Sequence, residues 1–277
     1  MGDKPVALVT GATSGIGQAT CHRLRDRGYR VFAVGRNPDA LELLRSRGLD
    51  ARAVDVTEEA AVTMLVREIE AEHGAVDVLV NNAGYGLSGP LEQVALADLR
   101  SLLETNVVAV LRLCQAVLPA MRCRGSGTIV NLGSTAGRFT TPGAGAYHIS
   151  KYGLSALSLG LAAEVRQWGV RVVLIEPTGV RATNFIANRV GPARRDPGDD
   201  PYAEFKRRYD RISAGMAKMP VVTVTADTVA AAVVRAVENR DPKPRYVVGL
   251  SGKASVAARR LLTDRMWDRI LMTGLKP

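Results

Sequence analysis

The stretch "VALVTGATSGIG" at residues 6–17 decides the fold, because it joins a short apolar run to a glycine-rich turn. The run VALVT (6–10) is apolar on both faces, as a strand inside a covered parallel sheet is. Gly11, Gly15 and Gly17 follow, and a helical pattern begins at 15–27. Glycines let the backbone approach a pyrophosphate, and a helix N-terminus offers it free N–H groups and a positive dipole end. This order of elements predicts a dinucleotide-binding unit.

The rest of the chain repeats this alternation of strand and helix. Further apolar runs predict strands at 29–35, 51–56, 76–84, 127–134, 170–177 and 245–250. Helical patterns lie at 38–47, 57–73, 95–122, 147–168 and 225–239. Strict alternation without a linker predicts an α/β fold, a single domain over residues 1–277. We expect a doubly wound parallel sheet of seven strands with helices on both faces.

Two segments depart from this rhythm. Residues 186–220 are polar, rich in charge and punctuated by proline and glycine, with one short helix expected at 201–213. An irregular stretch of this length predicts a substrate-binding lid or a disordered loop. Residues 253–277 form a C-terminal extension, with an arginine-rich amphipathic helix expected over 253–273. That helix is expected to pack on the sheet edge or on a neighbouring subunit, and contact with a membrane surface is the less favoured alternative.

Composition limits the classes of function. The net charge of +10 comes from basic residues spread along the chain. Because nucleic-acid binding needs a clustered basic face, we expect no nucleic-acid partner. Cys21, Cys114 and Cys123 form no CxxC pair, which favours a reducing compartment. No signal-peptide pattern precedes the first strand, and no apolar stretch reaches the ~18 residues of a membrane span. A cytoplasmic protein without an integral membrane segment is predicted, and no metal site.

The end of the second predicted strand, "AVGRNP" (33–38), bears on the choice of cofactor. Enzymes that prefer NAD place an acidic residue there for the ribose hydroxyls. In this sequence Gly35 and Arg36 occupy that position instead. The guanidinium group of an arginine can bind the 2′-phosphate of NADP(H). NADP(H) is therefore expected over NAD(H). Asp55 and Val56 end the third strand, where they would contact the adenine ring; the alternative for Asp55 is a capping role at Thr57.

The stretch "AYHISKYGLSALSLGLAAEV" (146–165) contains Tyr147 and, one helical turn later, Lys151. Residues four apart lie on the same helix face. A free tyrosine has a pKa near 10, and a cation close by favours the phenolate. The pair is therefore a candidate proton-transfer couple. His148 points about 100° away from Tyr147, so a structural or interface role is expected for it.

Taken together, these motifs resemble the short-chain dehydrogenase/reductase family, in the family's order and from Pro5 to about Leu250. "TGATSGIG" matches the cofactor loop, "DV" (55–56) the adenine site and "NNAG" (81–84) the fourth-strand motif. "ETNVVAV" places Asn106 in the helix that carries the family's asparagine. "NLGSTAG" places Ser134 at the end of the fifth strand, thirteen residues before Tyr147, which is the family's own separation.

The resemblance implies a catalytic set of Asn106, Ser134, Tyr147 and Lys151. Tyr147 would give a proton to a ketone oxygen that Ser134 holds. Lys151 would bind the nicotinamide ribose, and Asn106 would anchor a water leading to Lys151. At the sixth strand the family's Pro-Gly is Pro177-Thr178-Gly179 here. The implied cofactor-binding residues are Gly11, Thr13, Ser14, Gly15, Ile16, Gly17, Arg36, Asp55, Val56, Asn82, Ala83, Gly84, Tyr147, Lys151, Pro177, Val180 and Thr183.

Within the family, "EPTGVRATNF" (176–185) and the two departing segments resemble the branch of hydroxysteroid and retinol dehydrogenase-like reductases. That branch implies a small-molecule substrate that is a bulky lipophilic ketone or secondary alcohol, such as a steroid, a retinoid or a polyketide. The residues that would form an apolar pocket, or merely pack the lid, are Phe139, Pro142, Phe185, Ile186, Tyr202 and Phe205.

The main hypothesis is an NADP(H)-dependent ketoreductase or alcohol dehydrogenase. Two alternatives remain open: use of the same pair for dehydration or epimerisation, and a non-catalytic NADP-sensing protein. The resemblance also implies a homodimer or homotetramer, in which the helices at 95–122 and 147–168 pair between subunits.

Overall fold

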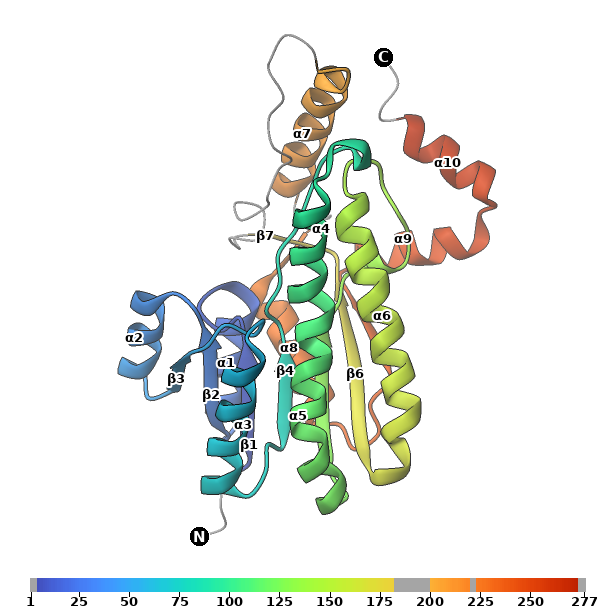
Figure 1. Cartoon of the computed structure of the whole chain (residues 1–277). Helices are drawn as coiled ribbons and strands as arrows, with labels where there is room; N and C mark the ends of the chain where they lie inside the picture. Colours follow the sequence, from blue (N-terminus) through green and yellow to red (C-terminus); the bar gives the residue numbers. More distant parts are fainter. Residues whose placement is uncertain (1–3, 182–199, 220–222, 274–277) are drawn as a thin grey trace.

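The computed structural model describes residues 4–181, 200–219 and 223–273, and its core is a parallel sheet of seven strands (Figure 1). The spatial order is β3-β2-β1-β4-β5-β6-β9, with every neighbouring pair parallel. This confirms the predicted doubly wound sheet in a single domain. The strands are β1 (Val6–Thr10), β2 (Arg30–Gly35), β3 (Asp50–Ala53), β4 (Val78–Asn81), β5 (Gly127–Leu132), β6 (Val170–Pro177) and β9 (Arg245–Val248).

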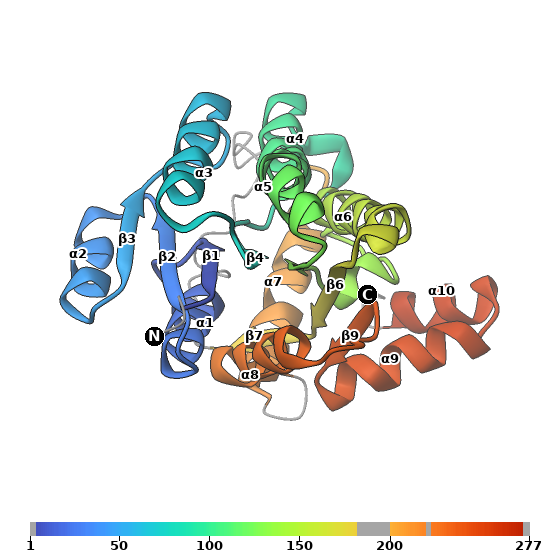
Figure 2. The ribbon, with the colours of Figure 1, turned by 90° about the horizontal axis from the view of Figure 1, so that it is seen from below.

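Helices cover both faces of the sheet (Figure 2). One face carries α1 (Gly15–Asp26), α2 (Pro38–Ser46) and α8 (Ala226–Glu238), and the other carries α3 (Glu59–His73), α5 (Ala109–Arg124) and α6 (Gly145–Val165). Two of these helices begin at a polar N-cap residue. The Asn37 side chain accepts a hydrogen bond from the Ala40 N–H at the start of α2, and the Thr225 side chain accepts one from the Thr228 N–H at the start of α8. Because all strands run the same way, their carboxyl ends meet along one edge.

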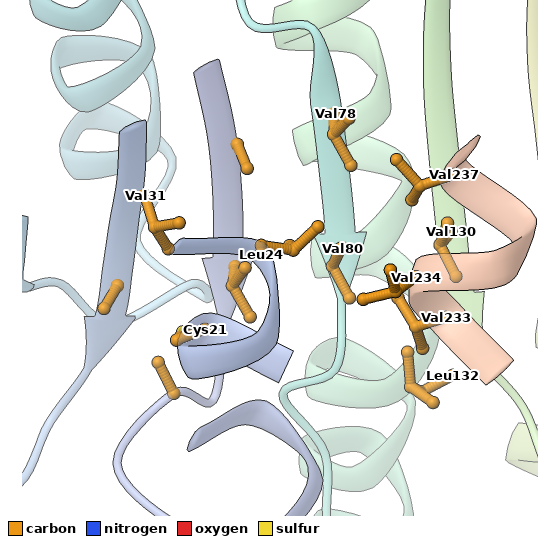
Figure 3. Close-up of a cluster of buried hydrophobic side chains, with 14 of the residues drawn as sticks. Cys21, Leu24, Val31, Val78, Val80, Val130, Leu132, Val233, Val234 and Val237 are labelled. Carbon is orange, nitrogen blue, oxygen red and sulfur yellow. The ribbon is translucent and has the colours of Figure 1, made fainter. Parts of the chain in front are cut away.

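Small aliphatic side chains fill the space between the sheet and each helical layer. Figure 3 shows Leu24 of α1 and Val233 of α8 in one buried cluster with Val80 of β4 and Val130 of β5, and all four are fully buried. A buried leucine or valine contributes about 1.5–3 kcal/mol relative to an exposed one. The packed layers therefore hold the strand ends, and the loops after them, in fixed positions.

The helix expected at 95–122 is interrupted. It consists of α4 (Leu96–Leu103), a π-helical turn (Glu104–Val108) and α5, and Asn106 lies in the turn. The whole run, Leu96–Arg124, is long and apolar enough to span a membrane by length and composition. Our expectation that no apolar stretch reaches that length was wrong, because a window of this run remains apolar on average despite the charged residues within the run. In this fold the run is a sheet-covering helix, with Leu113 and Met121 buried in the core.

Other differences lie after β6. The short strands β7 (Gly179–Arg181) and β8 (Thr223–Thr225) form a separate parallel pair that the sequence did not predict. The helix expected at 201–213 is α7 (Ala203–Lys218). Most of the rest of the predicted lid, 186–220, lies outside the described residues. Short 3₁₀ turns occur at Leu91–Gln93, Thr135–Gly137 and Arg166–Trp168.

The prediction of a single C-terminal helix over 253–273 was wrong. There are two helices, α9 (Leu250–Leu261), which lies beside β9, and α10 (Asp264–Thr273), which lies further from that strand (Figure 2). Leu262 is extended, and the Thr263 hydroxyl accepts from the Met266 N–H at 3.4 Å. A threonine that caps the next helix therefore ends the continuous pattern.

Candidate active site

One large cleft of about 1660 Å³ opens at the carboxyl edge of the sheet. Loops that follow six of the strands line it, together with residues of α4, the π-helical turn, α6, α7, α9 and α10. The predicted site residues that line it are Gly11, Thr13, Ser14, Gly15, Ile16, Arg36, Asp55, Val56, Asn82, Ala83, Gly84, Ser134, Tyr147, Lys151, Pro177 and Val180. The fold thus brings together residues that lie far apart in the sequence.

The glycine-rich turn after β1 needs its glycines for conformation and for space. Gly11 and Gly15 have φ values of 62° and 54°, a region that disfavours other residues. A Cβ on Gly17 would lie 2.3 Å from the Gly11 carbonyl oxygen, so α1 packs directly under the turn. The turn and the N-terminus of α1 form the predicted pyrophosphate cradle.

Asn82 braces this turn from the neighbouring strand. Its side-chain amide donates to the carbonyl oxygens of Thr10 and Gly11, at 3.0 Å in each case. The Thr10 hydroxyl in turn accepts from the N–H groups of Asn82 and Ala83, at 3.0 and 3.1 Å. Sequence reasoning placed Asn82 in the cleft wall but missed that it shapes the glycine turn.

At the other end of the cleft, Arg36 and Asp55 form an ion pair of 3.2 Å. The Arg36 side chain is 77% exposed and has room to swing toward a bound group. Asp55 also accepts from the N–H and hydroxyl of Thr57, at 3.0 and 2.8 Å. Burial works to raise the pKa of Asp55, but these bonds and Arg36 together hold it below its usual value. In this structure the contacts of Asp55 with Thr57 therefore match the alternative interpretation, in which Asp55 has a capping role.

Tyr147 and Lys151 lie in the first turns of α6, beside the end of β5. The Lys151 ammonium is buried, donates to the Leu132 carbonyl oxygen at 2.8 Å, and lies 5.7 Å from the centroid of the Tyr147 ring. Burial lowers the pKa of Lys151 to about 8. Ser134 follows β5, and its hydroxyl accepts from the Ala136 N–H at 3.1 Å. All three residues line the cleft.

Asn106 holds the loop after β4 against α6. Its side-chain oxygen accepts from the Tyr85 N–H at 3.1 Å, and its amide donates to the Tyr85 carbonyl and to the Ser150 hydroxyl at 3.0 and 3.1 Å. Ser150 in turn donates to the Tyr147 carbonyl at 2.8 Å. The sequence suggested that Asn106 anchors a water molecule, and that role stays a prediction. Its role in holding the loop after β4 was missed, because its hydrogen-bond partners there are mostly backbone atoms.

His148 braces the loop that follows Ser134. It is buried, its Nδ1 lies 2.9 Å from the Ala136 carbonyl oxygen, and its Nε2 accepts from the Thr141 N–H at 2.9 Å. A ring that donates on one side and accepts on the other is neutral. Burial also lowers its pKa. These bonds fit the structural role expected for His148.

Part of the cleft wall is apolar. Phe139 and Pro142 line it as predicted, whereas Tyr202 and Phe205 do not. Tyr209 and Ile212, one and two turns further along α7, line it instead, because only one face of that helix meets the cleft. Ile270 and Leu271 of α10 complete the wall. Phe185, Ile186 and the predicted cofactor contact Thr183 lie outside the described residues.

Comparison with known proteins agrees with this geometry. A family model described as short chain dehydrogenase matches residues 5–191. An uncharacterized oxidoreductase of Escherichia coli, YbbO, is 34% identical over 95% of this chain and 93% of its own length. The NADPH-dependent 3-dehydrocapnine reductase of Ornithobacterium rhinotracheale is 31% identical over 98% of this chain and 97% of its own.

Solved structures give the same result. A short-chain dehydrogenase from Streptomyces avermitilis superposes with a TM-score of 0.80 at 30% identity, covering 99% of this chain and 96% of that one. Other matching structures hold NADP⁺ or NAD. A nicotinamide dinucleotide is thus the cofactor class of the proteins that this chain resembles.

Proposed function

The chain belongs to the short-chain dehydrogenase family, and we propose that it is an NADP(H)-dependent oxidoreductase that interconverts a ketone and a secondary alcohol. The observation that carries the proposal is that Ser134, Tyr147 and Lys151 line the same cleft as a glycine turn suited to a dinucleotide. Reduction of a ketone needs a hydride on carbon and a proton on oxygen. A bound NADPH supplies the hydride.

The protein's own residues supply the rest of the chemistry. Ser134 holds the substrate oxygen by a hydrogen bond, and Tyr147 gives that oxygen its proton in reduction or takes it back in oxidation. Lys151, buried beside the Tyr147 ring, stabilises the phenolate that forms when the proton leaves. Lys151 also binds the ribose, Asn106 holds a proton-conducting water, and Thr183 contacts the nicotinamide.

A lipophilic substrate, as in the hydroxysteroid and retinol dehydrogenase-like branch, is supported by the apolar wall of the cleft. Phe139, Ile212 and Ile270 face the cleft from three different elements. Such walls favour ligands with a large apolar body and a few polar groups.

Turnover of NADPH against a ketone panel tests the function. Ketones of increasing apolar size, from small aliphatic ones to steroid-like and long-chain ones, are mixed with NADPH and followed by loss of its absorbance. We expect turnover with the bulky apolar members and little with the small ones. A protein that binds NADPH and reduces no member would contradict the proposal.

NADP(H) is the proposed cofactor because β2 is followed directly by Arg36 rather than by an acidic residue, and Arg36 lines the cleft. Arg36→Asp removes a charge-assisted hydrogen bond to the 2′-phosphate and adds a repelling carboxylate. We expect NADPH affinity to fall by about 10–100-fold while NADH affinity stays or rises. Titration of both cofactors by fluorescence measures this.

Arg30→Asp is the matched control, since Arg30 lies at the opposite end of the same strand. It should leave both cofactor affinities near wild type. Equal NADPH affinity in Arg36→Asp and wild type would remove Arg36 from the phosphate site.

A homodimer or homotetramer in the cytoplasm is the proposed state. Large apolar side chains remain exposed on the outer surfaces of the π-helical turn, α5 and α6: Val108, Leu111, Ile149 and Tyr152. Adjacent exposed apolar residues on two long helices support subunit pairing there.

A further inference from the structure

A carboxylate with no part in the proposed chemistry is buried at the end of β6. Glu176 has no exposed surface and accepts three hydrogen bonds from the Arg138 guanidinium. Arg138 Nε lies 2.8 and 3.0 Å from the two carboxylate oxygens, and Nη2 lies 2.7 Å from one of them. The Arg138 side chain is itself only 15% exposed. A buried charge pair with this geometry holds its two backbones in a fixed relation.

Each member of the pair is joined to a different part of the site. Arg138 ends the 3₁₀ turn that Ser134 begins, and the Gly137 N–H donates to the Ser134 carbonyl at 2.9 Å. Glu176 directly precedes Pro177, Thr178, Gly179 and Val180, which line the cleft where the nicotinamide is proposed to lie. The ion pair therefore joins the residue that would hold the substrate oxygen to the segment that would hold the hydride donor.

A second guanidinium extends the link to α6. Arg245 on β9 lies within electrostatic reach of Glu176, whose charge opposes the lowering of the Arg245 pKa by burial. Arg245 donates to the Ser155 hydroxyl, one turn beyond Lys151 on the same helix. A Cβ on Gly137 would lie 2.7 Å from the Lys151 carbonyl oxygen, so the Ser134 turn also rests directly on α6.

We infer that Arg138 and Glu176 are positioning residues, which set the distance from Ser134 to the nicotinamide-binding segment and so from the substrate carbonyl to the hydride donor. This inference rests on the proposed function. The planar, two-point contact of a guanidinium with a carboxylate fixes orientation as well as distance, which an ammonium cannot do. Because a misplacement of about 1 Å can cost about 10²-fold in rate, a small shift of this turn is enough to slow hydride transfer.

Arg138→Lys tests the inference, since it keeps the charge and loses the two-point contact. We expect kcat to fall by about 10–100-fold, while KM and the Kd for NADPH change by about twofold or less. The kinetic isotope effect on kcat, measured with NADPH deuterated at both C4 positions, should increase, because hydride transfer becomes slower than the other steps. The control is Arg124→Lys. Arg124 also forms an ion pair, with Asp77 at 3.0 Å, but this pair lies at the opposite edge of the sheet from the cleft.

A purely structural pair would give a different result. If Arg138→Lys lowers Tm yet keeps the wild-type kcat and isotope effect, the inference is overturned while the proposed function stands. If Arg138→Lys does not fold, the double variant Arg138→Gln/Glu176→Gln removes both charges together and is measured in the same way. If the wild-type protein binds NADPH and reduces no ketone, the proposed function fails, and the inference fails with it.

Discussion

Tyr147→Phe is expected to reduce ketone turnover by about 10³-fold or more, while NADPH still binds. The substitution removes one hydroxyl, and with it the only proton donor that the proposal places at the substrate oxygen. Acid–base catalysis by a positioned side chain contributes about 10²–10⁴-fold. The ring remains beside the Lys151 ammonium, so the wall of the cleft should keep its shape. Steady-state kinetics and a fluorescence titration with NADPH measure the two quantities.

The same helix offers a control. Tyr152 lies five residues further along α6 and is 42% exposed, on the face turned away from the cleft. Tyr152→Phe removes only the hydroxyl and keeps the apolar ring that the proposed subunit pairing uses, so kcat should stay within about twofold of wild type. Wild-type turnover in Tyr147→Phe would exclude Tyr147 as the proton donor. Loss of NADPH binding in that variant would show that the hydroxyl is needed for the cofactor site itself.

Lys151→Met is expected to lower kcat by about 10²–10³-fold, within the range that acid–base groups contribute. Methionine fills the buried space of Lys151 without its charge, so the phenolate of Tyr147 loses its stabilising cation. Lys243→Met is the control, because Lys243 is an exposed lysine in the loop before β9. If Lys151→Met reduces ketones at the wild-type rate, the Lys151 ammonium is not needed to stabilise the Tyr147 phenolate.

The pH dependence gives a second measure of Lys151. Burial lowers its pKa to about 8, so the ammonium is present below that pH and is lost above it. Hence kcat/KM for reduction should fall as the pH rises through about 8. In Lys151→Met this decline should be absent. A decline at the same pH in the variant would assign it to another group.

Much of this fold can be predicted from local sequence patterns. Runs such as VALVT predict buried parallel strands, and the glycines at 10–17 predict the tight turn from β1 into α1, because both depend on neighbouring residues. The spacing of Ser134 and Tyr147 is informative for the same reason: a strand end and a helix start are joined by one short loop. These parts of the cleft were predictable.

Features that depend on contacts between distant residues were not predictable. Arg138 and Glu176 lie 38 positions apart, and no periodicity links them. Asn106 bonds mainly to backbone atoms of Tyr85, which leave no trace in the side-chain pattern. The break before α10 was missed because the cap at Thr263 lies inside an otherwise continuous amphipathic pattern. In each case tertiary or capping contacts decide the conformation.

Transfer of deuterium to a ketone from NADPH that carries deuterium at both C4 positions tests the central claim most directly. The ketone is one that the panel identifies, and the product is analysed by mass spectrometry and NMR. The proposal predicts one deuterium on the carbinol carbon of the alcohol for each NADPH consumed. An altered product without deuterium, or with NADPH unconsumed, would mean dehydration or epimerisation. Either result, or NADPH binding without any change in the ketone, would contradict hydride transfer at this site.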